Sequence, residues 1–389
     1  MKFIHTGDWH IGKIVNEFHM TEDQEFVLQQ LFKIIEDEKV DGLIIAGDLF
    51  DRSVAPVEAV ELLNKVFNKI VIDLKTPILA IAGNHDSGER LSFGSDLVKE
   101  KGLYISGLFN EEVEKVSLED DFGKVNFYLI PYVEPSIVRS IFKDTSIKDY
   151  DDAAKIILNK IKDTMNKDER NVIVAHGYVS YISDKEEDTL ERCDSERPLS
   201  IGGSEIINSS YFEDFTYTAL GHLHGPQKVG KENIRYAGSL LKYSFSEVKQ
   251  KKGVTIVNID GDGVVTTEFK EFVPKRDFRI IKGNLENLLD KEVYKETNVE
   301  DYIKVILTDD GEVLEPMRKL RAVYPNVMEL VRENPLKENK ISQEKRNFKE
   351  KDKVKLFQNF YKDIKGKECS EEAIEIMKNI IEEIERKGE

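Results

Sequence analysis

The sequence has few of the features that mark a secreted or membrane-spanning protein. Its only two cysteines, Cys193 and Cys369, lie far apart, so we expect no disulfide framework, and a reducing cytoplasm fits. No apolar run reaches the roughly 18 residues that a bilayer-spanning helix needs. The strand-like residues 1–8 lack the architecture of a signal peptide. We therefore expect a cytoplasmic protein without membrane contact.

Basic residues are in the minority. The chain carries 57 Lys and Arg against 74 Asp and Glu, which gives a formal net charge of −17. This balance argues against a protein that grips polyanions over its whole surface. It still permits a phosphodiester substrate at one local pocket, because two divalent ions would bring four positive charges against two negative charges from carboxylate ligands.

Histidine is scarce too, yet its distribution is not random. Five of the seven histidines fall in five short runs, and each run follows an apolar stretch typical of a buried strand. The runs are residues 7–10 (GDWH), 47–51 (GDLFD), 83–86 (GNHD), 175–177 (AHG) and 221–224 (GHLH). A single Gly-Asp or Gly-His is usually only a turn, but five such runs in order favour a metal site.

Seven polar side chains in these runs are the candidate metal ligands. They are Asp8, His10, Asp48, Asn84, His176, His222 and His224. Carboxylate and amide oxygens mixed with imidazoles make Mn²⁺ or Fe²⁺ natural occupants, leave Zn²⁺ or Mg²⁺ possible, and argue against a thiolate zinc site. One carboxylate is expected to bridge two ions roughly 3.5–4 Å apart, which would activate a bridging water. Glycine precedes four of the candidates, where we expect a positive φ or a close backbone approach.

The third run holds a histidine that we expect to serve catalysis rather than metal binding. His85 would face the substrate phosphate, donating a hydrogen bond or protonating the leaving oxygen. Asp51 is expected to orient His85 and keep it protonated; the alternative is a helix cap or an ion pair with Arg52. Asp86 is expected to support a ligand. Arg90 is a candidate for either a phosphate contact or a surface ion pair.

The remaining pattern predicts an α/β protein with a two-sheet core over residues 1–273 and helices outside it. Expected strands are residues 2–6, 42–46, 78–82, 125–130, 172–175, 216–220, 234–237, 253–259 and 264–272. One helix is expected to begin at a capping box formed by Thr21 and Gln24, and a second to span residues 55–74. His5 in the first strand and His19 in a polar loop are expected to be structural or exposed.

Three further segments follow the core. Residues 274–335 predict a small α/β module with strands at 278–281, 302–307 and 327–331 and helices at 285–289 and 316–323. Residues 336–350 are highly charged and indicate a linker. Residues 351–389 predict a helix-loop-helix hairpin, with Gly366 between the helices and Ser370 as the N-cap of the second. The apolar faces of such an isolated hairpin would need a partner.

The five runs, read as D-x-H, GD-x-x-D, GNHD, a lone H and GH-x-H, resemble the calcineurin-like metallophosphoesterase superfamily. Two longer stretches, residues 83–93 and 236–247, and the Arg276-Asp277 pair that opens the second module resemble its SbcD branch of nuclease subunits. The likeness covers residues 1 to about 335, and the tail matches only in architecture. The resemblance implies that the core is a metallophosphoesterase domain, that the second module is a capping domain and that the tail is a helical hairpin.

The resemblance also implies an activity and partners. These are a two-metal, manganese-dependent DNA nuclease, a 3′→5′ exonuclease on double strands and an endonuclease on single strands or hairpins. It would act in DNA repair and recombination as a homodimer with an SbcC-type ATPase, whose coiled coil would bind the tail helices. One ion would be held by Asp8, His10, Asp48 and His224, and the other by Asp48, Asn84, His176 and His222.

Two departures from the wider superfamily bear on alternatives. Archaeal and eukaryotic nucleases tend to carry a second catalytic histidine where this chain has Asp51, so a two-histidine mechanism is not expected. Protein phosphatases usually have Arg before a GNHE motif, whereas this chain has Ala82 there and Asp86 in place of Glu. A phosphoesterase acting on cyclic nucleotides or phosphoproteins therefore ranks second. A non-catalytic DNA-end scaffold ranks third, because all seven candidate ligands are present.

Overall fold

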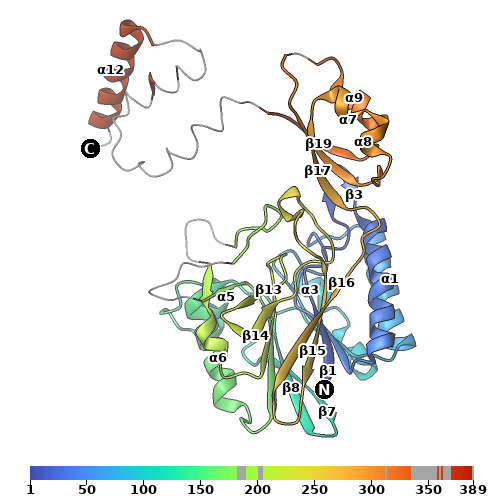
Figure 1. Cartoon of the computed structure of the whole chain (residues 1–389). Helices are drawn as coiled ribbons and strands as arrows, with labels where there is room; N and C mark the ends of the chain where they lie inside the picture. The colour runs from blue at the N-terminus through green and yellow to red at the C-terminus, as the bar shows by residue number, and fades with distance from the viewer. Residues whose placement is uncertain are drawn as a thin grey trace. The chain divides into compact units, whose positions relative to one another are not determined.

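The computed structural model describes residues 1–181, 190–199, 205–311, 313–333, 357–358, 361 and 369–387. It divides into two compact units, Met1–Val331 and Arg332–Glu389. The first unit is built around two six-stranded mixed sheets, with helices outside them (Figure 1). No helix among the described residues combines the length and the apolar character that a membrane span requires.

The first sheet contains the strands that lead to three of the five runs. Its order is β16 (Val265–Glu271), β15 (Gly253–Ile259), β1 (Lys2–Thr6), β4 (Gly42–Ile45), β5 (Ile78–Ile81) and β6 (Leu103–Ser106). The four strands from β1 to β6 are parallel, and β15 and β16 extend the sheet in antiparallel pairing. The parallel strands are continuous apolar segments because both faces of the sheet are covered.

The second sheet carries the other two runs. Its order is β13 (Gln227–Val229), β14 (Lys231–Tyr236), β12 (Tyr217–Gly221), β9 (Arg170–His176), β8 (Gly123–Ile130) and β7 (Glu114–Asp120). The strands from β14 to β8 are parallel, and β13 and β7 form antiparallel edges. Residues of β9 and β12 pair directly, so Gly221 lies opposite His176.

Side chains alternate between the inner and outer faces of the sheets. Phe3 and Ile44 of the first sheet pack against Phe127 and Val174 of the second in the core between them. The outer face of the first sheet packs on α1 (Thr21–Glu38) and α2 (Val57–Asn68), and that of the second on α5 (Pro135–Phe142) and α6 (Tyr150–Thr164). The result is the predicted two-sheet α/β core with flanking helices (Figure 1).

The start of α1 differs from the prediction. Thr21 is the first helical residue, its predecessor Met20 has φ −87° and ψ −3°, and no side chain caps the helix. Gln24 is buried and turns away from the helix end, where it binds the main chain of the first run: its side chain donates to the carbonyl oxygens of Trp9 and His10. The predicted capping box is therefore wrong, because a tertiary role takes the glutamine.

Several other elements differ from expectation. The helix predicted over 55–74 ends at Asn68 and continues as a π-helix, η1 (Lys69–Asp73). The edge strands β6, β7 and β13 were not predicted. Short elements also carry connections that the pattern did not predict: β2 (Ile14–Val15), β3 (Phe18–His19), α3 (Gly88–Leu91), α4 (Ser95–Val98), η2 (Lys99–Lys101), β10 (Tyr178–Ser180), β11 (Ile206–Asn208), η3 (Ser209–Phe212) and η4 (Phe245–Glu247).

Residues 278–332 form a three-stranded sheet with a small hydrophobic core of its own. Its elements are β17 (Phe278–Gly283), α7 (Leu285–Leu288), α8 (Lys291–Tyr294), β18 (Tyr302–Leu307), α9 (Pro316–Arg321) and β19 (Val327–Arg332), of which only α8 was not predicted. The module is fastened to α1: the fully buried Asp23 carboxylate pairs with Arg276 at 2.5 Å and accepts the Tyr302 hydroxyl at 2.8 Å. The module therefore lies within the first compact unit.

The second unit contains α12 (Glu371–Lys387). The Ser370 hydroxyl accepts a hydrogen bond from the amide of Ala373 at 3.3 Å, so the predicted N-cap is confirmed. The predicted linker, residues 336–350, lies outside the described residues. So does most of the first predicted tail helix, of which residues 357, 358 and 361 are described and helical.

Candidate metal centre

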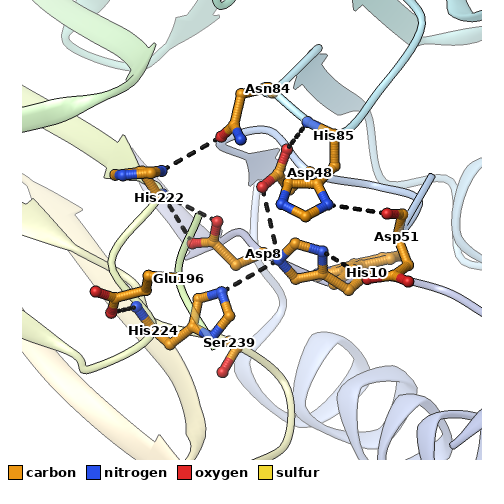
Figure 2. Close-up of polar contacts among 12 residues, drawn as sticks. Asp8, His10, Asp48, Asp51, Asn84, His85, Glu196, His222, His224 and Ser239 are labelled. Atoms are coloured by element: carbon orange, nitrogen blue, oxygen red, sulfur yellow. Dashed lines mark hydrogen bonds and ion pairs between the residues drawn. The ribbon is translucent and has the colours of Figure 1, made fainter. Parts of the chain in front are cut away.

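All five runs meet at one edge of the two sheets. Three of them follow β1, β4 and β5, and the other two lie at the ends of β9 and β12. Because the strands within each sheet are parallel, their carboxyl ends share an edge, and polar side chains there face a common space. Figure 2 shows Asp8, His10, Asp48, Asn84, His222 and His224 pointing toward one another.

The Asp48 carboxylate lies at the centre of the cluster. Its Oδ2 atom is 3.5 Å from the Nε2 atom of His10 and 3.5 Å from that of His176. His10 Nε2 in turn lies 3.2 Å from His224 Nε2. An oxygen that faces imidazoles on both sides is where a carboxylate shared between two ions would lie.

Asn84 and Asp8 complete the set. The Asn84 Oδ1 atom lies 2.9 Å from His176 Nε2 and 3.3 Å from His222 Nδ1. The main-chain amide of His222 donates to both carboxylate oxygens of Asp8, at 2.9 and 3.0 Å. Two groups of donor atoms within 4.8 Å of one another share Asp8: one with His10 and His224, the other with Asp48 and His176. The structure thus brings together all seven predicted ligands.

The charges of this cluster are unbalanced. Asp8 is fully buried and Asp48 is 2% exposed. Among the ion pairs of the described residues, neither has a Lys or Arg partner. Burial, and then the neighbouring charge of Asp48, raise the pKa of Asp8 well above its usual range. In their ionised form, two buried carboxylates without a Lys or Arg partner would be stabilised by cations, and the donor set of oxygens and imidazoles fits divalent ions.

The imidazoles present unprotonated nitrogens. Burial lowers the pKa of His10, His176 and His222, so these rings are neutral, which is the form that binds metal. The Nδ1 atom of His176 lies 2.9 Å from the carbonyl oxygen of Ala46. A carbonyl only accepts, so the proton is on Nδ1, and the Nε2 lone pair faces Asp48 and Asn84.

Outside the runs, His5 is structural and His19 is exposed, as predicted. The His5 ring lies between the Tyr217 hydroxyl and the carbonyl oxygen of Leu220, and burial lowers its pKa to about 3. Neither histidine belongs to the groups of donor atoms found among the described residues. The histidines of the cluster therefore all come from the five runs, and the two histidines outside the runs do not join it.

The backbone of the cluster is strained at the candidate ligands themselves. Positive φ angles occur at four of them: Asp8 (50°), His10 (46°), Asp48 (52°) and His222 (111°). Of the four glycines that precede a ligand, only Gly47 has a positive φ, of 91°. Two others are required by close approach: a Cβ on Gly83 would lie 2.1 Å from Asp48 Oδ1, and one on Gly221 1.8 Å from the Ala46 oxygen. Such strain persists where the surrounding fold imposes it, and it is typical of functional sites.

The close approach at Gly83 provides a sharp test. Gly83→Ala is expected to displace the Asp48 carboxylate, weaken Mn²⁺ binding and lower stability by about 1–3 kcal/mol, the usual range for an overpacked site. Calorimetric titration with Mn²⁺ and thermal unfolding measure the two effects. Gly42→Ala, on the strand leading to Asp48, is the control, because its Cβ would meet only ordinary contacts of 3.5 Å or more. Unchanged Mn²⁺ affinity in Gly83→Ala would contradict the placement of Asp48.

His85 lies beside the cluster. Its main-chain amide donates to Asp48 Oδ1 at 2.9 Å, and its Nδ1 atom lies 2.9 Å from the main-chain carbonyl oxygen of Asp51. The Asp51 carboxylate instead pairs with Lys13 at 2.7 Å, lies 3.7 Å from His10 Nδ1 and has Arg52 at 3.6 Å. Asp51 thus contacts the His85 ring through its main-chain carbonyl, while its carboxylate is paired with Lys13 and lies near Arg52, the ion pair that was the alternative.

Asp86 supports the cluster without joining it. Its carboxylate accepts hydrogen bonds from the main-chain amides of Leu49, Phe50 and Gly83, at 3.0, 2.9 and 2.9 Å. Burial, and then the charge of Asp48, raise the pKa of Asp86 to about 7. The carboxylate ties the second run to the third, which is the predicted supporting role. Arg90 is exposed.

A layer of supporting side chains was missed in the sequence. The Gln24 amide, which binds the first run, also contacts the Tyr243 hydroxyl, and that hydroxyl donates to the Trp9 carbonyl at 2.6 Å. Ser195, Glu196, Glu247 and Lys252 surround His224 in the same way. These residues have no mutual spacing that signals a site, because they come from segments far apart in the chain.

Comparison with known proteins places this centre in a family. A model of the calcineurin-like phosphoesterases matches residues 1–226. The chain belongs to the calcineurin-like phosphoesterase family. A second model, described as the type 5 capsule protein repressor C-terminal domain (SbcD_C), matches residues 274–365. The chain is also 33% identical over 386 residues to the SbcD subunit of the nuclease SbcCD of Staphylococcus epidermidis, covering 98% of each protein.

Two solved structures resemble this calcineurin-like phosphoesterase more distantly. The protein TT1561 of Thermus thermophilus has 11% identity and a TM-score of 0.38, covering 69% of this chain and 98% of its own. A dimetal phosphatase from Danio rerio has 11% identity and a TM-score of 0.41, covering 70% and 98%. The sequence relationship therefore carries the assignment: the chain is a metallophosphoesterase and a homologue of the SbcD nuclease subunits, with candidate ligands for a dimetal centre.

Proposed function

We propose that this chain is the two-metal DNA nuclease subunit of an SbcCD-type complex and hydrolyses phosphodiester bonds. The observation that carries the proposal is the convergence of two buried carboxylates, neither paired with Lys or Arg among the described residues, with an amide and four imidazoles on a metallophosphoesterase fold. The full-length likeness to an SbcCD nuclease subunit supports DNA as the substrate class. The proposed role is DNA repair and recombination.

We assign the ligands as two overlapping sets. The first is Asp8, His10, Asp48 and His224, and the second is Asp48, Asn84, His176 and His222. The central position of Asp48 Oδ2, 3.5 Å from a histidine of each set, supports a shared carboxylate. Mn²⁺ is the proposed ion because the donors mix hard oxygens with imidazole nitrogens. When bound, the ions would supply Lewis acidity toward phosphate oxygens and activate water as the nucleophile.

We propose that His85 orients the substrate phosphate or donates a proton to the leaving oxygen. The Asp51 carbonyl accepts from His85 Nδ1, which leaves Nε2 of His85 for a phosphate oxygen or for the leaving oxygen. The main-chain amide of His85 donates to the Asp48 carboxylate, so the ring is anchored to the metal centre. The Lys13 ammonium, paired with the Asp51 carboxylate, adds a positive charge beside this position.

The second module is proposed as a capping domain, residues 274–335, that helps to shape the DNA-binding face. A cavity between it and the core is lined by Tyr243, Ser244 and Phe245 on one side and by Lys304 and Glu329 on the other. The Tyr243 ring packs edge-on against His10, with 5.7 Å between ring centroids. The cavity thus adjoins the metal centre, where a nucleic-acid strand leaving the site would pass.

The C-terminal residues 351–389 are proposed to bind the coiled coil of an SbcC-type ATPase. In α12, Ile376 and Ile380 are 56% and 43% exposed. Apolar side chains one turn apart on an exposed helix are typical of a helix that docks against a partner. A homodimer of the chain in the complex is part of the same proposal.

The experiment is a nuclease assay on the complex with the cognate SbcC-type ATPase. With Mn²⁺ and ATP, linear duplex and hairpin DNA are expected to be cleaved, and turnover on cyclic nucleotides and phosphopeptides is expected to be far lower. Intact DNA with good turnover of the small phosphoesters would favour the phosphoesterase alternative. A protein that holds no transition metal and gains no activity with Mn²⁺ would instead be a DNA-end scaffold.

A further inference from the structure

We infer that Ser195 is a positioning residue for the metal centre: it fixes the proton of His224 on Nδ1 and so keeps the Nε2 lone pair available to an ion. The inference rests on the proposed dimetal function. A series of hydrogen bonds through residues outside the predicted ligand set links His224 to a buried ion pair. The series runs from His224 through Ser195 and Glu247 to Lys252.

The contacts are short and consecutive. The Ser195 hydroxyl lies 2.8 Å from His224 Nδ1 and donates to Glu247 Oε1 at 2.6 Å. The other carboxylate oxygen of Glu247 accepts from the Lys252 ammonium at 2.6 Å. Glu247 is fully buried and Lys252 is 6% exposed. We call this series of contacts, from His224 through Ser195 and Glu247 to Lys252, the relay. It joins an imidazole to an ion pair inside the protein, where hydrogen bonds are strengthened by the low dielectric.

The proton count fixes the tautomer. A serine hydroxyl has one proton to donate, and a carboxylate only accepts. Because the Ser195 proton goes to Glu247, the contact with His224 requires that Nδ1 carries a proton and donates it to the hydroxyl oxygen. A neutral His224 then has a bare Nε2, and this is the atom that faces His10 Nε2 at 3.2 Å.

The ring is also held through its main chain. The His224 amide donates to Glu196 Oε1 at 2.8 Å, and its carbonyl oxygen accepts from Lys252 at 2.7 Å. Ser195 and Glu196 are neighbours on the same loop, so one loop contacts both the ring and the backbone of this histidine. The side chain therefore has its position and its protonated nitrogen set by the same elements.

The relay acts on only one of the two proposed ion sites. His176, in the other set, has Nδ1 against the neutral carbonyl of Ala46. An imidazole whose N–H is bonded toward a carboxylate is the more basic ligand, and loss of such supporting contacts weakens metal binding by about 10–100-fold. Removal of the Ser195 hydroxyl should therefore affect one ion and leave the other in place.

The substitution Ser195→Ala leaves the other hydrogen bonds of Glu247 in place. Glu247 Oε1 keeps the amide of Tyr243 at 3.1 Å and the hydroxyl of Ser244 at 3.0 Å, and Oε2 keeps Lys252. The buried carboxylate thus stays satisfied. His224 Nδ1 then has no acceptor within hydrogen-bond distance among the described residues, because Glu247 Oε1 lies 3.9 Å away. The proton can therefore move to Nε2, where it opposes metal binding. Ser195→Thr retains a hydroxyl and serves as the conservative variant.

The test combines two measurements on the full-length chain. The ring nitrogen shifts of ¹⁵N-histidine-labelled, metal-free protein report each tautomer, and seven histidines make assignment by substitution tractable. Mn²⁺ titration then reports affinity and stoichiometry. We expect the Nδ1–H tautomer of His224 in the wild type and in Ser195→Thr. In Ser195→Ala we expect a mixed tautomer and one of the two Mn²⁺ affinities weaker by about 10–100-fold.

The outcomes separate this inference from the proposed function. Ser117→Ala removes a β7 hydroxyl that donates to Asn126 on the neighbouring strand β8, outside the candidate metal centre. It is the matched control and should bind Mn²⁺ like the wild type. A wild type with the Nε2–H tautomer of His224 would overturn the inference even if Ser195→Ala proved unstable. Two unchanged Mn²⁺ affinities in Ser195→Ala would also overturn it. A wild type that binds no Mn²⁺ would instead remove the proposed metal centre.

Discussion

Asp48→Asn is expected to abolish the binding of both metal ions and to reduce nuclease turnover by at least about 10²-fold, the effect of losing one electrostatic group at an active site. Its Oδ2 atom faces a histidine of each ligand set at 3.5 Å, so the substitution removes a charge that both ions would share. Neutral asparagine keeps an oxygen for the His85 amide, so the local backbone contact survives. Mn²⁺ titration and the nuclease assay measure the two losses.

The same variant should not lower the stability of the metal-free protein. Burial and the Asp48 charge both raise the pKa of Asp8, so neutralising Asp48 relieves a repulsion. The metal-free variant is expected to melt no lower than the metal-free wild type, while added Mn²⁺ raises the melting temperature of the wild type only. Asp73→Asn, on the exposed surface, is the control. Two tightly bound ions in Asp48→Asn would refute the central role of this carboxylate.

His85→Ala is expected to keep both ions and lower kcat by about 10²–10⁴-fold, the usual contribution of a positioned acid or base. The ring meets the Asp51 carbonyl through Nδ1 and is outside both assigned ligand sets, although one of its nitrogens forms a third group of donor atoms within 4.8 Å of one another with His10 and the Asp51 carboxylate. Its amide bond to Asp48 is main-chain and persists in alanine. The change should therefore fall on kcat, with Mn²⁺ affinity unchanged.

Exposed His19 provides the control for this variant, because His19→Ala removes an imidazole outside the cluster. Kinetics under saturating Mn²⁺ separate the effect on turnover from any effect on metal occupancy. A full nuclease rate in His85→Ala would show that the ring takes no part in the chemistry. Loss of an ion would show that His85 is a ligand.

The convergence of the seven candidate ligands was predictable because its information is local. Each candidate stands in a short run directly after an apolar strand, and parallel strands bring such ends to one edge of a sheet. The same locality explains the prediction of β1, β4, β5 and β9. It also explains the error at Thr21 and Gln24: the pattern has a capping box, but the fold uses the glutamine to bind Trp9 and His10.

The rest of the centre depends on contacts between distant segments. Gln24 meets Tyr243 across 219 residues, and Glu247 meets Ser195 across 52. The glycines at 47, 83 and 221 have the predicted positive φ or close approach, but the positive φ at Asp8 and Asp48 themselves was not predicted. The partner of the Asp51 carboxylate, Lys13, appears only once the first two runs are adjacent. Pairings of this kind cannot be predicted from spacing within one run.

The most direct measurement is anomalous scattering at the manganese edge from crystals of the full-length chain grown with Mn²⁺. We expect two peaks among the seven candidate ligands, with Asp48 touching both and with His176 and His224 on different ions. A single peak, peaks away from these side chains, or none with Mn²⁺ in excess would contradict this expectation.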